Sequence, residues 1–133
     1  MRTLGGAAWV NDYVGIPYAP FGRDWQGVDC YGLLKLVYRD EYNIDLPDWL
    51  VDPVDLRDVN KHIEDAVTSG QFTETDTPAD GDIVVCYRTR AAHHIGLFVG
   101  GSVLHADKPN VVCEHLSKFK RRFVKVVIGE WTP

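Results

Sequence analysis

Apolar residues recur at helical spacing in the first half of the chain and at strand spacing in the second half. In 30–38 they repeat every three to four positions, which predicts a helix with Asp29 as its N-cap. A similar stripe predicts a helix at 56–67, and a shorter helix is expected at 7–14. Proline and glycine residues break the pattern between 16 and 28, which predicts a loop.

Short runs of β-branched and aromatic residues predict strands in the second half. These runs lie at 83–87, 95–99, 103–104, 111–113 and 123–128. The polar, turn-rich stretch before them carries no such run. Because helices come first and strands follow, the order favours an α+β fold with an antiparallel sheet.

The composition is that of an ordinary globular domain. With 133 residues, of which 45% are apolar, the chain is expected to form one domain over 1–133 and not a disordered segment. A net charge of −5 argues against nucleic acid as a partner. No apolar run is long enough to span a bilayer, so no membrane insertion is expected. Residues 1–6 contain one arginine and lack the apolar core of a signal peptide, so no signal peptide is expected.

Cys30 is the sharpest chemical feature. The three cysteines are odd in number and widely spaced, which indicates a reducing compartment and no disulfide framework. At the first position of a helix, unpaired backbone N–H groups stabilise a thiolate, so we expect a lowered pKa for the Cys30 thiol. The alternative is a buried cysteine packed as a small apolar residue. Cys86 and Cys113 lie in strand patterns and are expected to pack in this way.

Two histidines are expected to meet on a hairpin. The Gly-Gly pair at 100–101 stands between two apolar runs and predicts a two-residue turn. Strand alternation then places His94 and His105 on one face as diagonal neighbours, with Asp107 beside them. A three-residue turn would bring His93 to that face in place of His94.

A cysteine and a paired histidine suit nucleophilic catalysis. The histidine takes the thiol proton, and a third polar group, either His105 or Asp107, orients the ring. We expect the Cys30 sulfur to lie roughly 3–4 Å from the His94 ring in the substrate-free protein. The alternative is that both histidines are ordinary half-buried strand residues. Because the chain has no closely spaced cysteine pair, a metal site built from Cys30, His94 and His105 is disfavoured, and no cofactor is expected.

Basic and aromatic residues alternate in part over 118–125. This stretch is expected to form an edge strand guarded by charge. The functional alternative is a contact with an anionic glycan or a protein partner.

Several motifs, taken in order, resemble the NlpC/P60 family of cysteine peptidases. They are Gly15-Ile16-Pro17-Tyr18, Gly27-Val28-Asp29-Cys30-Tyr31-Gly32-Leu33, Gly81-Asp82-Ile83-Val84, His94-Ile95-Gly96-Leu97-Phe98-Val99 and Val103-Leu104-His105-Ala106. The resemblance implies a papain-like α+β fold in which N-terminal helices pack on an antiparallel β-sheet. It also implies hydrolysis of amide bonds in the peptide stems of bacterial peptidoglycan.

The resemblance also assigns roles to residues. It makes Cys30 the nucleophile, His94 the base and His105 the residue that orients His94, and the Cys30 backbone N–H is a natural oxyanion donor. The positions matched to substrate binding are Tyr18, Asp29 and Tyr31. Many cell-wall members have serine in place of Tyr31, so the stem-peptide specificity of this chain stays open.

One part of the resemblance points to bacteriophages. Cys30-Tyr31-Gly32-Leu33, followed by Leu46-Pro47, looks most like the tail-associated members of the family. This implies other phage tail proteins as partners, synthesis in the host cytoplasm and a place in the virion tail. The alternatives are a structural tail-assembly protein with little or no hydrolase activity, and acyl transfer on the same fold.

Overall fold

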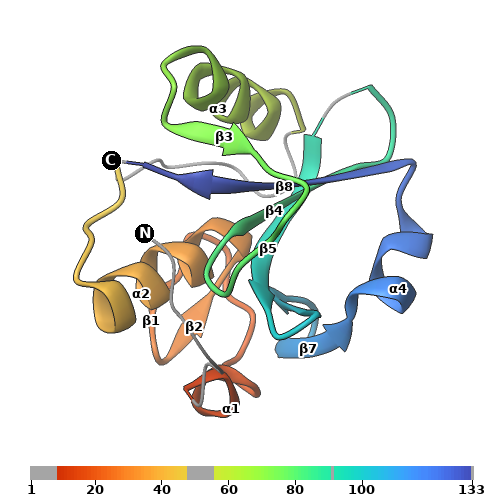
Figure 1. The fold of residues 1–133 in the computed structure, drawn as a ribbon. Helices are drawn as coiled ribbons and strands as arrows, with labels where there is room; N and C mark the ends of the chain where they lie inside the picture. Colours follow the sequence, from red (N-terminus) through yellow and green to blue (C-terminus); the bar gives the residue numbers. More distant parts are fainter. Residues whose placement is uncertain (1–8, 48–55, 91, 133) are drawn as a thin grey trace.

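The computed structural model describes residues 9–47, 56–90 and 92–132, which form a six-stranded antiparallel sheet with helices on both faces (Figure 1). In sheet order the strands are β3 (Phe72–Glu74), β8 (Lys125–Trp131), β4 (Ile83–Tyr87), β5 (Ala92–Val99), β6 (Ser102–Ala106) and β7 (Val111–His115). The helices are α1 (Val10–Tyr13), α2 (Cys30–Tyr42), α3 (Leu56–Thr68) and α4 (Leu116–Phe119), followed by the 3-10 turn η1 (Lys120–Arg122). The expected α+β class is confirmed.

Helix α2 begins and ends on local signals. Its N-cap is Asp29, whose carboxylate accepts a hydrogen bond from the Gly32 N–H at 2.8 Å. It ends at Asn43, which adopts the left-handed conformation with φ 55° and donates its N–H to the Tyr38 carbonyl. The predicted helix and its cap are both confirmed.

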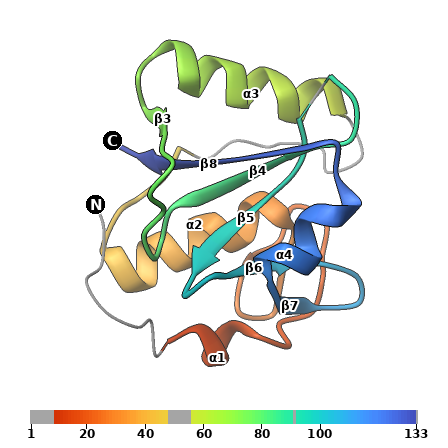
Figure 2. The same ribbon diagram turned by 45° about the vertical axis from the view of Figure 1, so that its right-hand side comes forward.

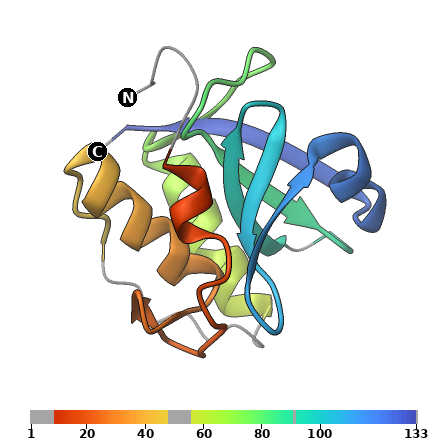
Figure 3. The same ribbon diagram turned by 90° about the horizontal axis from the view of Figure 1, so that it is seen from below.

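The sheet separates two apolar clusters. Helices α2 and α3 pack on one face, where they meet the inward-pointing residues Ile83, Val85, Ile95 and Leu97 (Figure 2). On the other face, Val84, Cys86, Val103 and Phe119 form a second, smaller cluster under α4. Successive strand residues point to opposite faces, so β4, β5, β6 and β8 contribute to both clusters. Helix α1 lies alongside α2, seen from below in Figure 3.

The β5–β6 hairpin has the predicted two-residue turn. Gly100 and Gly101 both have positive φ, 56° and 81°, and Val99 pairs with Ser102. A turn of this kind needs two residues with positive φ, which glycine adopts without steric cost. The register that would have brought His93 to the face of His105 is therefore excluded.

Three sequence expectations were wrong. The loop at 16–28 contains a small hairpin, β1 (Arg23–Asp24) and β2 (Gly27–Val28), and the polar stretch after α3 contains β3. The basic stretch 118–125 forms the end of α4 and η1 before β8 starts, and β8 lies between β3 and β4. The stretch 118–125 is therefore not an edge strand. Its alternating pattern of apolar and charged residues was too short to outweigh local helix formation.

The first helix lies where the sequence predicts it. Of the helix expected at 7–14, the described part is the four-residue α1, while residues 7 and 8 lie outside the described residues. None of the helices in the described ranges is both long enough and apolar enough to cross a bilayer.

Candidate active site

His94 on β5 and His105 on β6 are in direct contact. His94 Nε2 lies 3.1 Å from His105 Nδ1, and the two rings meet edge to face with centroids 5.2 Å apart. Gly96 lies between them: a Cβ built there would stand 3.1 Å from the His105 Cβ. The absence of a side chain at this position leaves room for the His105 ring, as the pairing predicts.

Two residues that the sequence analysis did not single out extend this pair. His105 Nε2 lies 2.6 Å from a carboxylate oxygen of Glu114 on β7, and the same oxygen forms an ion pair with Arg122. Asp107 lies 3.9 Å from the Arg122 guanidinium. Of the two candidates for the group beside His94, His105 therefore makes the contact and Asp107 takes part in the outer charge cluster.

Burial keeps both rings neutral. Burial, followed by the neighbouring His105, lowers the pKa of His94 to about 3. Burial also lowers the pKa of His105, which is only 2% exposed, although the Glu114 carboxylate opposes this shift. Burial acts to raise the pKa of Glu114, but hydrogen bonds from His105 and Arg122 outweigh it and lower that pKa, so the carboxylate is ionised at neutral pH.

Cys30 stands at the first position of α2, as expected, but its thiol is not activated. Burial, followed by the charge of Asp29, raises the thiol pKa to about 12. The backbone N–H groups of Tyr31 and Ile95 lower this pKa, but by less than burial raises it. The prediction of a lowered pKa was therefore wrong, because only 6% of Cys30 is exposed and a thiolate would lose its solvation.

The Cys30 sulfur lies beside the backbone that follows His94, but it is not hydrogen-bonded to the His94 ring. The Cys30 sulfur accepts a hydrogen bond from the N–H of Ile95, the residue that follows His94. Within the described part of the chain, no hydrogen bond joins this sulfur to the His94 ring. The structure thus brings the two histidines together and places the thiol beside the backbone of the first.

A polar cavity of about 120 Å³ opens at the histidine pair. It is lined by Arg88, His93, His94, His105, Asp107, Arg122 and Phe123. Both charged groups and an aromatic ring border it, so it suits a polar ligand with an apolar part. Cys30 does not line this cavity and belongs to the apolar cluster on the α2 face of the sheet.

The residues matched to substrate binding have strong internal contacts. Asp29 is 1% exposed, and besides capping α2 it accepts hydrogen bonds from Arg23 at 2.9 Å and from the Phe21 N–H at 2.8 Å. Its carboxylate holds the β1–β2 hairpin against the start of α2. Tyr18 is half-buried and has the ammonium group of Lys108 above its ring at 5.2 Å.

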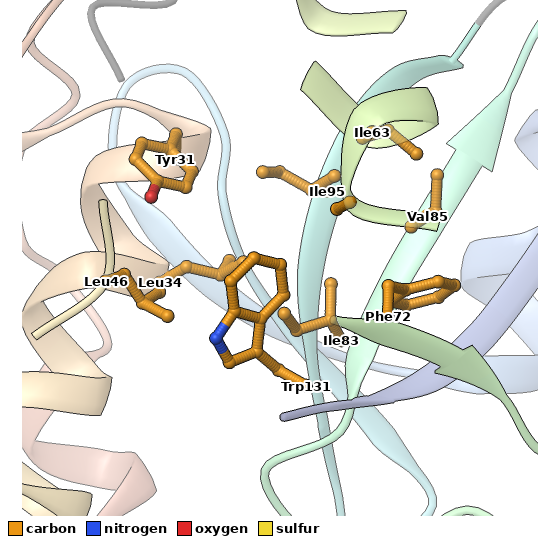
Figure 4. Close-up of a pocket in the computed structure, with 10 residues that line it drawn as sticks. Tyr31, Leu34, Leu46, Ile63, Phe72, Ile83, Val85, Ile95 and Trp131 are labelled. Atoms are coloured by element: carbon orange, nitrogen blue, oxygen red, sulfur yellow. The ribbon is translucent and has the colours of Figure 1, made fainter. Parts of the chain in front are cut away.

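Tyr31 is 4% exposed and packs in the core. Its hydroxyl donates to the Pro47 carbonyl, and its ring borders an apolar cavity of about 30 Å³ between α2, α3 and the sheet (Figure 4). Trp131, Ile95 and Leu34 point into the same space. A cavity of this size and lining is a packing gap with little room for a ligand.

The other two cysteines differ in burial. Cys86 is fully buried on β4, as expected, and pairs with His94 across the β4–β5 ladder. Cys113 on β7 is exposed, so the expectation that it packs in the core was wrong. It lies on β7, the last strand of the sheet.

One group of side chains has the composition of a metal site. The ligand atoms of His105, Asp107 and Glu114 lie within 4.8 Å of one another. Arg122 contacts both carboxylates, and Glu114 is hydrogen-bonded to His105, so the charges are already compensated. These residues therefore do not fit a cation. Within the described part of the chain, the ligand atoms of Cys30, His94 and His105 do not gather in one place as a metal site requires.

Comparisons with known proteins agree with this fold. Residues 15–128 match the model of the NlpC/P60 family. None of the curated proteins compared with the chain is significantly similar in sequence.

Solved structures show the same arrangement. The NlpC/p60 domain of the peptidoglycan hydrolase SagA superposes with a TM-score of 0.61 at 21% identity, over 91% of this chain and 92% of that one. NlpC1 from Trichomonas vaginalis gives a TM-score of 0.66 at 21% identity, over 99% and 48%. An NLP/P60 family protein similar to lipoprotein, from Staphylococcus aureus subsp. aureus Mu50, gives 0.58 at 20%, over 92% and 39%. The chain thus spans less than half of the last two proteins, and because the family model covers most of its length, the chain belongs to the NlpC/P60 family.

Proposed function

We propose that this chain is a cysteine peptidase that hydrolyses amide bonds in the peptide stems of bacterial peptidoglycan. The observation that carries the proposal is the ordered set of Cys30 at a helix start, beside the strand that presents His94 in contact with His105. The family match and the likeness to the domain of a peptidoglycan hydrolase support the choice of substrate.

The proposed reaction uses Cys30 as the nucleophile and His94 as the base. His94 Nδ1 takes the thiol proton while the sulfur attacks the amide carbonyl carbon, and the backbone N–H of Cys30 stabilises the oxyanion. The tetrahedral intermediate breaks its C–N bond, and His94 returns the proton to the leaving amine. Water, deprotonated by His94, then attacks the thioester carbonyl carbon. The C–S bond breaks, the acid product leaves, and His94 returns the proton to the Cys30 sulfur.

The raised thiol pKa determines how the first step occurs. With a neutral thiol and a neutral imidazole, proton transfer has to accompany sulfur attack and does not precede it. The sulfur lies at the backbone between His94 and Ile95, whereas the His94 ring contacts Phe123 on the α4 face, so we propose that both side chains move to bring the thiol to His94 Nδ1.

Replacing the sulfur tests the proposal. We expect Cys30→Ala to reduce the release of free amino groups from purified peptidoglycan by about 10³-fold or more. Cys113→Ala is the matched control, because it removes an exposed thiol on the edge strand β7 that no step of the mechanism uses, and it is expected to retain full activity. Digestion by Cys30→Ala at the rate of the parent would contradict the mechanism.

We further propose that the enzyme acts in a bacteriophage tail, where it opens the wall locally. The support is the resemblance of Cys30-Tyr31-Gly32-Leu33 and Leu46-Pro47 to tail-associated members. The chain would then be made in the host cytoplasm and assembled with other tail proteins. Mass spectrometry of virions, purified away from free lysate protein, is expected to detect its peptides; their confinement to the soluble lysate would contradict this location.

A structural tail-assembly protein is the second candidate, and the buried, neutral thiol of Cys30 favours it. The same peptidoglycan assay separates the two. A wild-type protein that releases no amino groups, yet is found in virions, would be structural.

A further inference from the structure

The donor and acceptor roles in the histidine pair can be deduced from its outermost member. The Glu114 carboxylate is ionised and can only accept hydrogen bonds, so His105 Nε2 must carry the proton of their 2.6 Å contact. His105 is neutral, which leaves its Nδ1 without a proton and able only to accept. In the 3.1 Å contact, His94 Nε2 is therefore the donor.

The consequence reaches the base itself. Because His94 is neutral and carries its proton on Nε2, its Nδ1 holds a free lone pair. That is the nitrogen which the proposed mechanism needs to take the thiol proton. From this geometry we infer that Glu114 is a positioning residue that sets the tautomer of His94 through His105.

The fold gives Glu114 this reach. His105 pairs with Val112 across the β6–β7 ladder, so Glu114, two positions further along β7, is its diagonal neighbour on the same face. Arg122 on η1 pairs with the carboxylate, and its guanidinium lies over the Phe119 ring at 5.2 Å. The charged groups facing His105 are thus Glu114, Arg122 and Asp107, with His94 on its inner side.

The carboxylate also serves the transition state. When His94 becomes an imidazolium, its Nε2–H still donates to His105 Nδ1, and no second proton transfer is needed. The negative charge of Glu114, one ring away, stabilises the new positive charge. A surface ion pair between Glu114 and Arg122 alone would contribute little to stability and would leave the tautomers unspecified.

The inference is tested on the ring tautomers by ¹⁵N NMR of histidine-labelled protein, without substrate. In the wild type we expect both His94 and His105 to be protonated on Nε2. Glu114→Ala removes the acceptor, and we expect a mixture of tautomers in both rings. Arg122→Ala breaks the ion pairs but keeps the carboxylate, so it is expected to retain the wild-type tautomers. Unchanged tautomers in Glu114→Ala would overturn the inference.

Kinetics give the second readout, which rests on the proposed function. We expect Glu114→Ala to lower kcat by about 10- to 100-fold with little change in KM, as for other groups that orient a catalytic ring. Glu114→Gln preserves the side-chain shape and replaces Glu114→Ala should the alanine variant not fold. Its matched control is Glu74→Gln on β3, the opposite edge strand of the sheet. Altered tautomers with an unchanged kcat would refute the positioning role. Because the tautomers are measured without turnover, a wild-type protein inactive on peptidoglycan would refute the proposed function and leave the tautomer result standing.

Discussion

At the scale of single residues, Cys30 lies at the start of a helix, but its surroundings keep the thiol in its neutral, protonated form. The backbone N–H groups near Cys30 favour the thiolate, but burial and the charge of Asp29 oppose it and prevail. His94 is held neutral by the same burial. The substrate-free protein therefore holds a neutral thiol and a neutral imidazole that are not hydrogen-bonded to each other, and it lacks the thiolate–imidazolium pair of many cysteine enzymes.

This charge state predicts the pH dependence of thiol alkylation. With a thiol pKa of about 12, we expect the rate at which iodoacetamide modifies Cys30 to rise about tenfold per pH unit from pH 7 to pH 9. The rate is followed at Cys30 by peptide mass spectrometry, so that exposed Cys113 serves as an internal reference. A plateau of fast alkylation near neutral pH would instead indicate an ion pair and contradict the neutral state.

At the scale of elements, the β5–β6 hairpin positions both rings, and Gly96 is its critical contact. A Cβ at Gly96 would lie 3.0 Å from the Leu104 carbonyl oxygen and 3.1 Å from the His105 Cβ. We expect Gly96→Ala to push β6 away from β5, to cost about 1–3 kcal/mol in the free energy of unfolding and to reduce activity at least tenfold. Urea denaturation and amino-group release measure the two effects.

The turn of the same hairpin supplies the control. Gly100 has φ 56° and open space around it, and asparagine tolerates this conformation better than most residues. Gly100→Asn is therefore expected to retain both stability and activity. Wild-type activity in Gly96→Ala would show that the spacing of the two strands does not control the histidine pair.

The histidine pair could be predicted from the sequence, whereas the groups around it could not. The turn at Gly100 and Gly101 fixed the register, and alternation then placed His94 and His105 on one face. Glu114 comes from β7, whose register is not fixed by the four-residue connection at 107–110 in the way that a two-residue turn fixes it, and Arg122 comes from a turn that resembled a strand. The high pKa of the Cys30 thiol was also beyond reach, because it arises from tertiary burial and not from the helix start.

At the scale of the whole molecule, the sheet divides the chemistry between its two faces. The thiol belongs to the larger apolar cluster under α2, while the histidine rings contact Phe119 and Phe123 on the α4 face. The α4 face therefore contains two buried, neutral imidazoles, those of His94 and His105, and their protonation is coupled to global stability.

This coupling predicts loss of stability in mild acid. The pKa of His94 is about 3 in the folded chain, against 6.5 as its ordinary value, so between these pH values the unfolded chain binds a proton that the folded chain does not. The contribution of His94 is thus fully present above pH 6.5 and declines by about 1.4 kcal/mol per pH unit as the pH falls towards 3. Urea denaturation between pH 7 and pH 4 measures the slope. His94→Gln is expected to reduce it. An equal slope in wild type and His94→Gln would mean that His94 is already protonated, or solvated, in the folded protein.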